Sequence, residues 1–124
     1  MSVVKRSRTR SEHVIATTDD SAATVYTCPA NCKAHMSLLF VTNPSANASD
    51  VLIQWVASGT TYAILGGKNL GTGEFIQFSN AFIVLEAGDV VKLTPSSTAG
   101  GNNPDIHMFC TVEEFFIPQQ SGVA

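Results

Sequence analysis

Residues 33–58 read KAHMSLLFVT, NPSANASD and VLIQWVAS in succession, and this stretch decides the fold. Its first and last segments alternate in polarity and are rich in apolar, β-branched and aromatic residues, which is typical of strands. The middle segment contains a proline and several Asn, Asp and Ser residues, which favour a turn-rich loop. We therefore predict two strands, over residues 33–42 and 51–58, joined by a loop.

The alternation within these strands predicts which side chains form core or contact surfaces. In the first strand we expect Leu38 and Phe40 to share a face with Met36. In the second we expect Ile53 and Trp55 to share a face. Trp55 is the only tryptophan, and its burial would contribute on the order of a few kcal/mol at ~25 cal/mol per Å². The opposite faces are also apolar, so a second sheet or a neighbouring subunit should cover them.

Short apolar runs separated by Gly, Pro and Asn fill the rest of the chain, and no segment has a helical period. The further strands that we expect cover residues 13–17, 22–28, 61–65, 74–78, 82–86, 90–94 and 105–117. About eight or nine short strands at this spacing predict an all-β fold. We expect an antiparallel β-sandwich, jelly-roll-like, with an extended N-terminal arm.

The N-terminal segment differs in charge from the rest of the chain. Only 14% of the 124 residues are charged, and the net charge is −3. The basic side chains near the N-terminus, with no acid among them, are Lys5, Arg6, Arg8 and Arg10. Alone, such a polar segment should be disordered. We expect these residues to become ordered by an inter-subunit contact with an acidic surface of a neighbour.

Three segments follow from this charge pattern. We predict a basic extended arm over residues 1–12, a β-sandwich domain over residues 13–118 and a polar C-terminal tail over residues 119–124. No run reaches the ~20 apolar residues that a membrane span needs, so we expect no membrane partner. The basic N-terminus lacks the apolar stretch of a secretory signal. Three cysteines argue against a disulfide framework and fit a reducing cytoplasm.

The cysteines and histidines offer one candidate metal site. Cys28 and Cys32 lie four positions apart, and His35 follows them. This spacing is within the range of a zinc knuckle, but the fourth ligand would have to be the distant Cys110 or His107. Small, semi-apolar cysteines at strand ends also pack well in cores. We favour packing and expect no metal and no cofactor.

The sequence offers no convincing catalytic group. The histidines lack a nucleophile motif such as G-x-S-x-G. Glu113 and Glu114 are neighbours on a predicted strand, so their side chains should point to opposite faces, and at best one of them meets a basic arm. The glycines of residues 66–68 lack the spacing and the following helix of a phosphate loop, and we interpret them as a hairpin turn. We therefore expect no enzymatic activity.

Several motifs occur together along most of the chain. They are TVYTCPANCKA at residues 24–34, Asn43, the Val-x-x-x-Trp strand at 51–55 and LEAGDVVKL at 85–93. This succession resembles small β-sandwich structural proteins of tailed bacteriophages, and the resemblance covers about residues 22–115.

The resemblance implies a non-enzymatic virion structural protein. Our first hypothesis is a capsid decoration or cement protein that forms homo-oligomers, as trimers for example, and bridges capsomers. Its partners would be copies of itself and the major capsid protein or other virion proteins, and its location the virion after assembly in the host cytoplasm. We do not expect nucleic acid to bind, because the body is acidic and no aromatic residue lies among the basic ones.

Two alternatives stay open. The same kind of domain also occurs as a tail, neck or fibre component. A carbohydrate-binding module is the third class, because Trp55 and Tyr62 could stack on a sugar ring if both were exposed.

Overall fold

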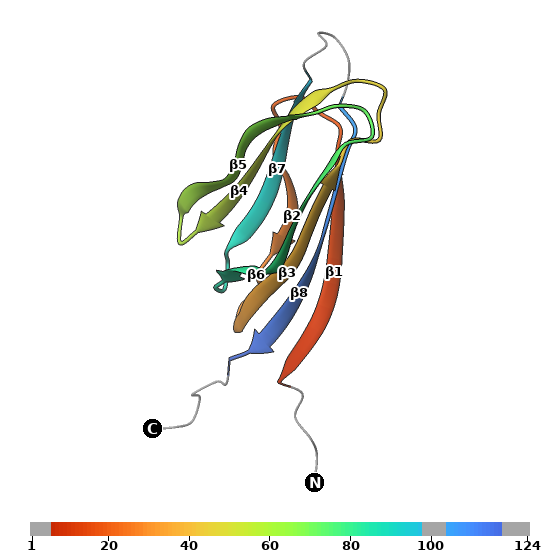
Figure 1. Ribbon diagram of the computed structural model, residues 1–124. Helices are drawn as coiled ribbons and strands as arrows, with labels where there is room; N and C mark the ends of the chain where they lie inside the picture. Colours follow the sequence, from red (N-terminus) through yellow and green to blue (C-terminus); the bar gives the residue numbers. More distant parts are fainter. Residues whose placement is uncertain (1–5, 98–103, 118–124) are drawn as a thin grey trace, which may run out of the picture.

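The computed structural model describes residues 6–97 and 104–117, and every regular element in them is a strand. The strands are β1 (Ser7–Ala16), β2 (Ala23–Thr27), β3 (Cys32–Thr42), β4 (Ser49–Ala57), β5 (Thr60–Leu70), β6 (Phe75–Leu85), β7 (Val90–Ser97) and β8 (Ile106–Phe116). They form two four-stranded sheets that lie face to face (Figure 1). The all-β sandwich expected from the strand spacing is confirmed.

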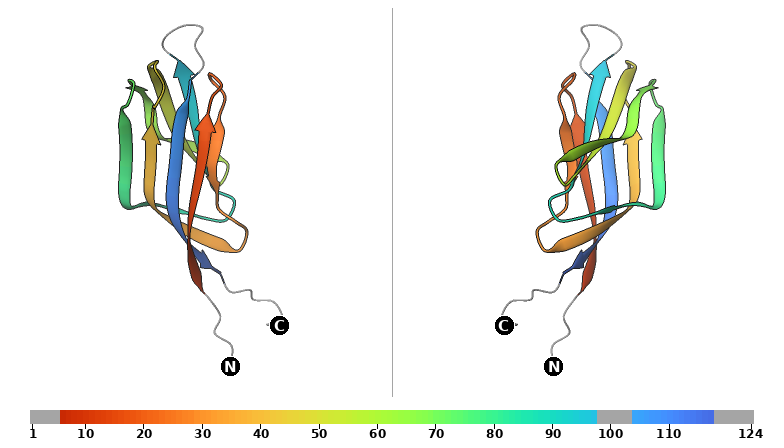
Figure 2. Two further views of the ribbon diagram at one scale, coloured as in Figure 1. Left: turned by 90° about the vertical axis from the view of Figure 1, so that its right-hand side faces the viewer. Right: turned by 90° about the vertical axis from the view of Figure 1, so that its left-hand side faces the viewer.

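The strand order gives the sandwich its jelly-roll character. The first sheet has the order β1-β8-β3-β6 and the second the order β2-β7-β4-β5. All the pairings are antiparallel. Of the pairs, only β4 and β5 follow each other in the chain, whereas β1 pairs with β8 and β3 with β6, as in two nested Greek keys. Figure 2 shows the four strands of the first sheet side by side from their outer side.

The core lies between the sheets and follows from the two-residue period of the strands. In β8 the inward side chains alternate strictly with outward ones and are fully buried: Ile106, Met108, Cys110 and Val112. They meet Val51 and Ile53 of β4 and Val91 and Leu93 of β7 in one apolar cluster. Ile53 therefore occupies the core, as the alternation in residues 51–58 predicts.

A bulge in β3 changes the expected faces of that strand. The register with both neighbouring strands shifts between Met36 and Leu38, which leaves Ser37 as an extra residue. Met36 is buried, whereas Leu38 and Phe40 lie on the outer side of the first sheet. The prediction of one shared face is wrong, because an extra residue reverses a two-residue alternation beyond it.

Glycine and asparagine positions that look like turns lie inside long strands. Residues 66–68 belong to β5, where the register shifts beside Val51 and Gly67 has φ +80°. The hairpin-turn interpretation of this segment is wrong, since a bulge also uses a glycine with positive φ. The strands expected over residues 74–78 and 82–86 are the single strand β6. Its pairing with β3 is interrupted after Ser79.

The described part of the basic arm is a strand of the same chain. Residues 7–12 belong to β1, which pairs with β8 from Ser7 opposite Phe115 to Ala16 opposite Ile106. The boundary at residue 12 therefore falls inside β1. Lys5 and the tail over residues 119–124 lie outside the described residues. Contact between the arm and a neighbouring subunit stays a prediction.

Candidate assembly surface

A buried carboxylate fixes the N-terminal strand. Glu114 of β8 is fully buried. Arg8 Nε donates to its Oε1 at 2.6 Å, while Arg10 Nη1 at 3.2 Å and Tyr26 Oη at 2.5 Å donate to its Oε2. The arginines come from β1 and the tyrosine from β2 of the other sheet. A buried anion needs such charged and hydrogen-bonding partners, so the cluster ties β1 to both sheets.

The electrostatics of the cluster keep Glu114 ionised. Burial alone would raise the pKa of Glu114, but hydrogen bonds from Tyr26 and Arg8 and the charge of Arg10 outweigh it and lower that pKa below its usual value. Burial and the bond to Glu114 raise the pKa of Tyr26 far above its usual range. Tyr26 therefore stays a hydrogen-bond donor and Glu114 stays an acceptor.

Three of the four predicted arm residues have partners within the chain, Arg8 and Arg10 through their side chains and Arg6 through its backbone. Arg10 also pairs with Glu12, and Arg8 lies 5.5 Å from the ring centre of Phe116. The carbonyl of Arg6 accepts a hydrogen bond from the backbone N–H of Phe116 at 2.9 Å. An open polar depression lies beside the cluster, between β1 and residues 24–27 of β2.

The outer side of the first sheet carries stacked aromatic rings. Phe40 of β3 lies opposite Phe109 of β8, with ring centroids 4.9 Å apart. Phe75 of β6 stacks on the other side of Phe40 at 5.1 Å. Phe75 is 59% and Phe109 40% exposed. Three rings from three strands therefore form a continuous surface that faces solvent.

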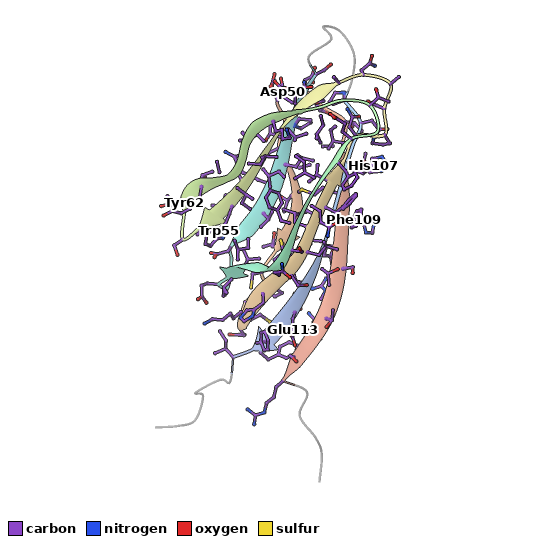
Figure 3. The ribbon with its side chains drawn as sticks, viewed as in Figure 1. Asp50, Trp55, Tyr62, His107, Phe109 and Glu113 are labelled. Atoms are coloured by element: carbon purple, nitrogen blue, oxygen red, sulfur yellow. The ribbon has the colours of Figure 1, made fainter. Side chains whose placement is uncertain are left out.

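Two cross-strand rows define this surface, which we call the aromatic face. The strand registers give one row as Gln77, Phe40, Phe109 and His13, and the next as Phe75, Thr42, His107 and Ile15. None of these eight residues is Asp, Glu, Lys or Arg, and Ile15 is 54% exposed. Figure 3 shows His107, Phe109 and Glu113 spaced along β8. On the two central strands, Phe40 and Phe109 lie beside Thr42 and His107, so the face combines aromatic rings with uncharged polar side chains.

Trp55 and Tyr62 do not form a flat exposed platform. Trp55 is half-buried and packs against the core, whereas Tyr62 of β5 is exposed (Figure 3). Their ring centroids are 5.8 Å apart with planes tilted by 40°. The indole Nε1 is buried and has no hydrogen-bond partner in the described part of the chain. Trp55 is thus held by the core, which does not favour sugar stacking.

Two buried polar residues organise the loops. Asn43 donates from Nδ2 to the carbonyls of Asn47 at 2.8 Å and Leu70 at 2.9 Å, and its Oδ1 accepts from the backbone and hydroxyl of Ser45. The carboxylate of Asp89 accepts from the backbone N–H of Ser58 and Glu86. Both residues act as loop anchors.

The candidate chemical groups are dispersed or buried. Burial raises the pKa of Cys28 and that of Cys110 to about 11, which keeps both as unreactive thiols. Glu113 is exposed while Glu114 is buried, so the predicted opposite orientation is confirmed. Within residues 6–97 and 104–117, no group of three His, Cys, Asp or Glu side chains could hold a metal ion. In the same residues, no helix is long and apolar enough to cross a membrane.

No protein-family model matches this chain, and no curated protein matches its sequence. Among solved structures, it is similar to a protein of Bacillus endospore appendages, described as a family of disulfide-linked pili. The identity is 15%, the match covers 94% of this chain and 93% of that chain, and the TM-score is 0.57. At this identity, the similarity shows a shared fold only.

Two further structures match more weakly. A structure of the Gt strain of infectious bursal disease virus matches with 12% identity over 94% of this chain and 34% of that chain, at a TM-score of 0.49. PirA matches with 9% identity over 89% of this chain and 96% of that chain, at a TM-score of 0.46. The chain thus spans about a third of the viral chain, and neither match carries an argument about function.

Sequence reasoning missed the exposed rings of the aromatic face. The signal was present in the last strand, because alternation from the buried Met108 puts His107 and Phe109 on the outer side. The exposed position of Phe75 has no such local signal, because the sequence predicts a short strand over residues 74–78 that is separate from residues 82–86. Only the register with β3 brings it beside Phe40.

Proposed function

We propose that this chain is a non-enzymatic structural subunit of a virion, a capsid decoration or cement protein that oligomerises and bridges capsomers. The observation that carries the proposal is the aromatic face, in which the exposed rings of Phe75 and Phe109 stack on the partly buried Phe40. Cores of protein–protein interfaces are enriched in aromatic residues and depleted of charge. An exposed patch of this kind on a small domain usually marks an interaction site.

The fold and the motifs support the same proposal. The appendage protein with a similar sandwich is described as forming pili, so this fold serves as an assembly subunit in that protein. The placement in a tailed-phage virion rests on the sequence motifs alone. The weakly charged composition, with 14% charged residues, fits a domain that neighbours cover.

A binding assay with empty phage heads tests the proposal. Purified chain is added to heads that lack it, and bound protein is measured after sedimentation. We expect saturable binding that raises the melting temperature of the heads. A Phe75→Lys variant should bind at least about tenfold more weakly, because a lysine would be buried without a partner. Unchanged binding by this variant would show that the aromatic face does not contact the head, and would contradict the proposal.

The alternative is a tail, neck or fibre component that uses the same face. Copy number in the virion separates the two placements. A copy number proportional to the number of capsomers supports a decoration protein. A copy number equal to a small multiple of the rotational symmetry of the tail or neck supports the alternative.

A further inference from the structure

We infer that the aromatic face binds the same face of a second copy of this chain, and that protonation of His13 and His107 weakens this contact. The inference rests on the proposed structural function, because it names the partner and the surface of one self-contact. It concerns pairs of subunits related by a two-fold axis, in which each copy presents the same residues to the other.

The outer side of the first sheet, of which the aromatic face is a part, is large enough to supply most of the interface of a stable pair. Four strands at about 4.8 Å spacing and about ten residues at about 3.3 Å per residue give an area on the order of 600 Å². A standard protein interface buries about 800 Å² on each partner. The outer side of the first sheet can supply most of this area without a change in backbone conformation.

The charges favour a second copy over a charged partner. The net charge of the chain is −3, so two copies repel each other over most of their surfaces. The two rows of the aromatic face carry no acidic or strongly basic residue, so these surfaces can meet without like-charge contact. Lys33 pairs with Glu86 at 3.6 Å near the far end of the sheet, so this cation already has a partner. A nucleic acid would find no free cation in either row.

Two histidines lie within the two rows of the aromatic face. His13 lies opposite Phe109, and His107 lies opposite Ile15 and Thr42. These two histidines are diagonal neighbours on adjacent strands, about 7–8 Å apart by usual sheet geometry. A pair of subunits would therefore enclose four imidazoles.

Few other titratable groups face these histidines. Asp105 lies 3.2 Å from Nε2 of His107 at the margin of the face. On β1 and β8, Ser11 and Thr111 follow along the same outer side. His35 lies further along β3, opposite Glu113 and beside the ring of Phe115. Each subunit thus contributes two imidazoles and one carboxylate, Asp105, which lies at the edge of the contact and beside His107 only. Protonation of both histidines would therefore bury one positive charge without a partner in each half of the contact.

Sedimentation velocity of the full chain at about pH 8 and about pH 5.5 tests the inference, because histidine changes charge in this range. We expect a concentration-dependent dimer at the higher pH and at least about tenfold weaker association at the lower pH. Phe109→Lys and Phe75→Lys should each weaken the dimer by at least about tenfold at the higher pH. Tyr62→Lys is the matched control, since Tyr62 is 52% exposed but lies on the second sheet.

The double variant His13→Gln with His107→Gln isolates the pH effect. We expect it to dimerise equally at both pH values, because glutamine stays neutral. A persistent pH effect in this variant would refute the role of the histidines. Circular dichroism checks that each variant is folded. Phe109→Lys and Phe75→Lys lie on different strands, so if one of them fails to fold, the other still tests whether the aromatic face forms the dimer.

The outcomes separate this inference from the proposed function. A monomeric wild-type chain that still binds heads overturns the self-contact and leaves the structural function intact. An oligomer unaffected by both lysine variants assigns self-association to another surface, and a face-dependent trimer overturns the two-fold pairing. A face-dependent dimer that binds no part of a virion supports the inference and contradicts the proposed function.

Discussion

The hydroxyl of Tyr26 on β2 donates a 2.5 Å hydrogen bond to Glu114 on β8, and so joins the two sheets at the edge of the sandwich. The same carboxylate binds Arg8 and Arg10 of β1. One buried anion therefore holds the first strand against both layers. A chain segment that looks like a free basic arm is attached by its backbone pairing with β8 and by its charges, rather than by apolar contacts.

We predict that Glu114→Gln lowers the free energy of unfolding by about 2–4 kcal/mol. The substitution removes the negative charge and leaves Arg8 and Arg10 without their shared partner. Urea denaturation measures the change. Glu113→Gln, on the exposed face of the same strand, is the control and should change stability by less than about 0.5 kcal/mol. Equal effects of the two substitutions would contradict a structural role for the buried cluster.

Acid should destabilise the wild-type chain through Glu114. The pKa of Glu114 is lowered in the folded state, so its contribution is complete above the unfolded value of about 4.3 and is lost as pH falls through the lower folded value. The stability difference between wild type and Glu114→Gln should therefore be constant above about pH 5 and shrink below about pH 4. Urea titrations across this range measure it, and a constant difference down to the lowest pH would argue against an ionised buried carboxylate.

Tyr26→Phe should lower the free energy of unfolding by about 1.5–3 kcal/mol, the usual contribution of a hydrogen bond to a charged group. Combined with Glu114→Gln, it should show a coupling of at least about 0.5 kcal/mol, because the two side chains are in direct contact. The matched control is Tyr62→Phe, whose hydroxyl belongs to an exposed ring. Simple additivity of the Tyr26 and Glu114 substitutions would show that the hydrogen bond contributes little.

Asn43→Asp should destabilise the chain by about 2–4 kcal/mol, although it changes one atom. The new carboxylate oxygen would face the carbonyls of Asn47 and Leu70, which now accept hydrogen bonds from Nδ2. Asn47→Asp, in the same loop, is the control and should cost under about 1 kcal/mol. Thermal unfolding compares the two, and a similar shift in melting temperature for both would argue against Asn43 as the loop anchor.

Two deletions distinguish the contribution of residues 2–5 to stability from that of the first half of β1. Removal of residues 2–5 should leave stability within about 1 kcal/mol, because β1 and its arginines remain. Removal of residues 1–12 should cost at least about 3 kcal/mol, since Glu114 then stays buried without its cations. Head binding by the shorter deletion tests whether Lys5 contacts a neighbour: weaker binding supports the contact, and wild-type binding contradicts it.

The local sequence pattern predicted most of the strands but only part of the surface. Residues 51–58 alternate without interruption, so the burial of Ile53 could be predicted. In β3 the bulge at Ser37 has no glycine or proline to signal it, so the prediction that Met36 shares a face with Leu38 and Phe40 is wrong. The bulge is visible only in the register with β6 and β8.

The pairing of β1 could not be predicted from its own residues. Residues 7–12 have no apolar face, and their partner Glu114 lies more than 100 positions away. The alternation of polar and apolar residues reports only on residues close together in the sequence. The position of β1 also depends on ion pairs with a residue of the distant strand β8. The opposite orientations of Glu113 and Glu114 could be predicted, but which one meets the arginines could not.

The antiparallel pairing of β1 with β8 also sets the order of events during protein synthesis. At about 5–20 residues per second, β1 leaves the ribosome several seconds to tens of seconds before its partner strand exists. Until β8 emerges, Arg8 and Arg10 lack their carboxylate, and the edge of β3 that β8 will occupy is open. Long-range pairing of this kind is slow to nucleate. Until β8 has been synthesised and has paired, the first sheet is incomplete and Phe40 lacks its stacking partner Phe109, so the proposed binding surface can form only together with this strand.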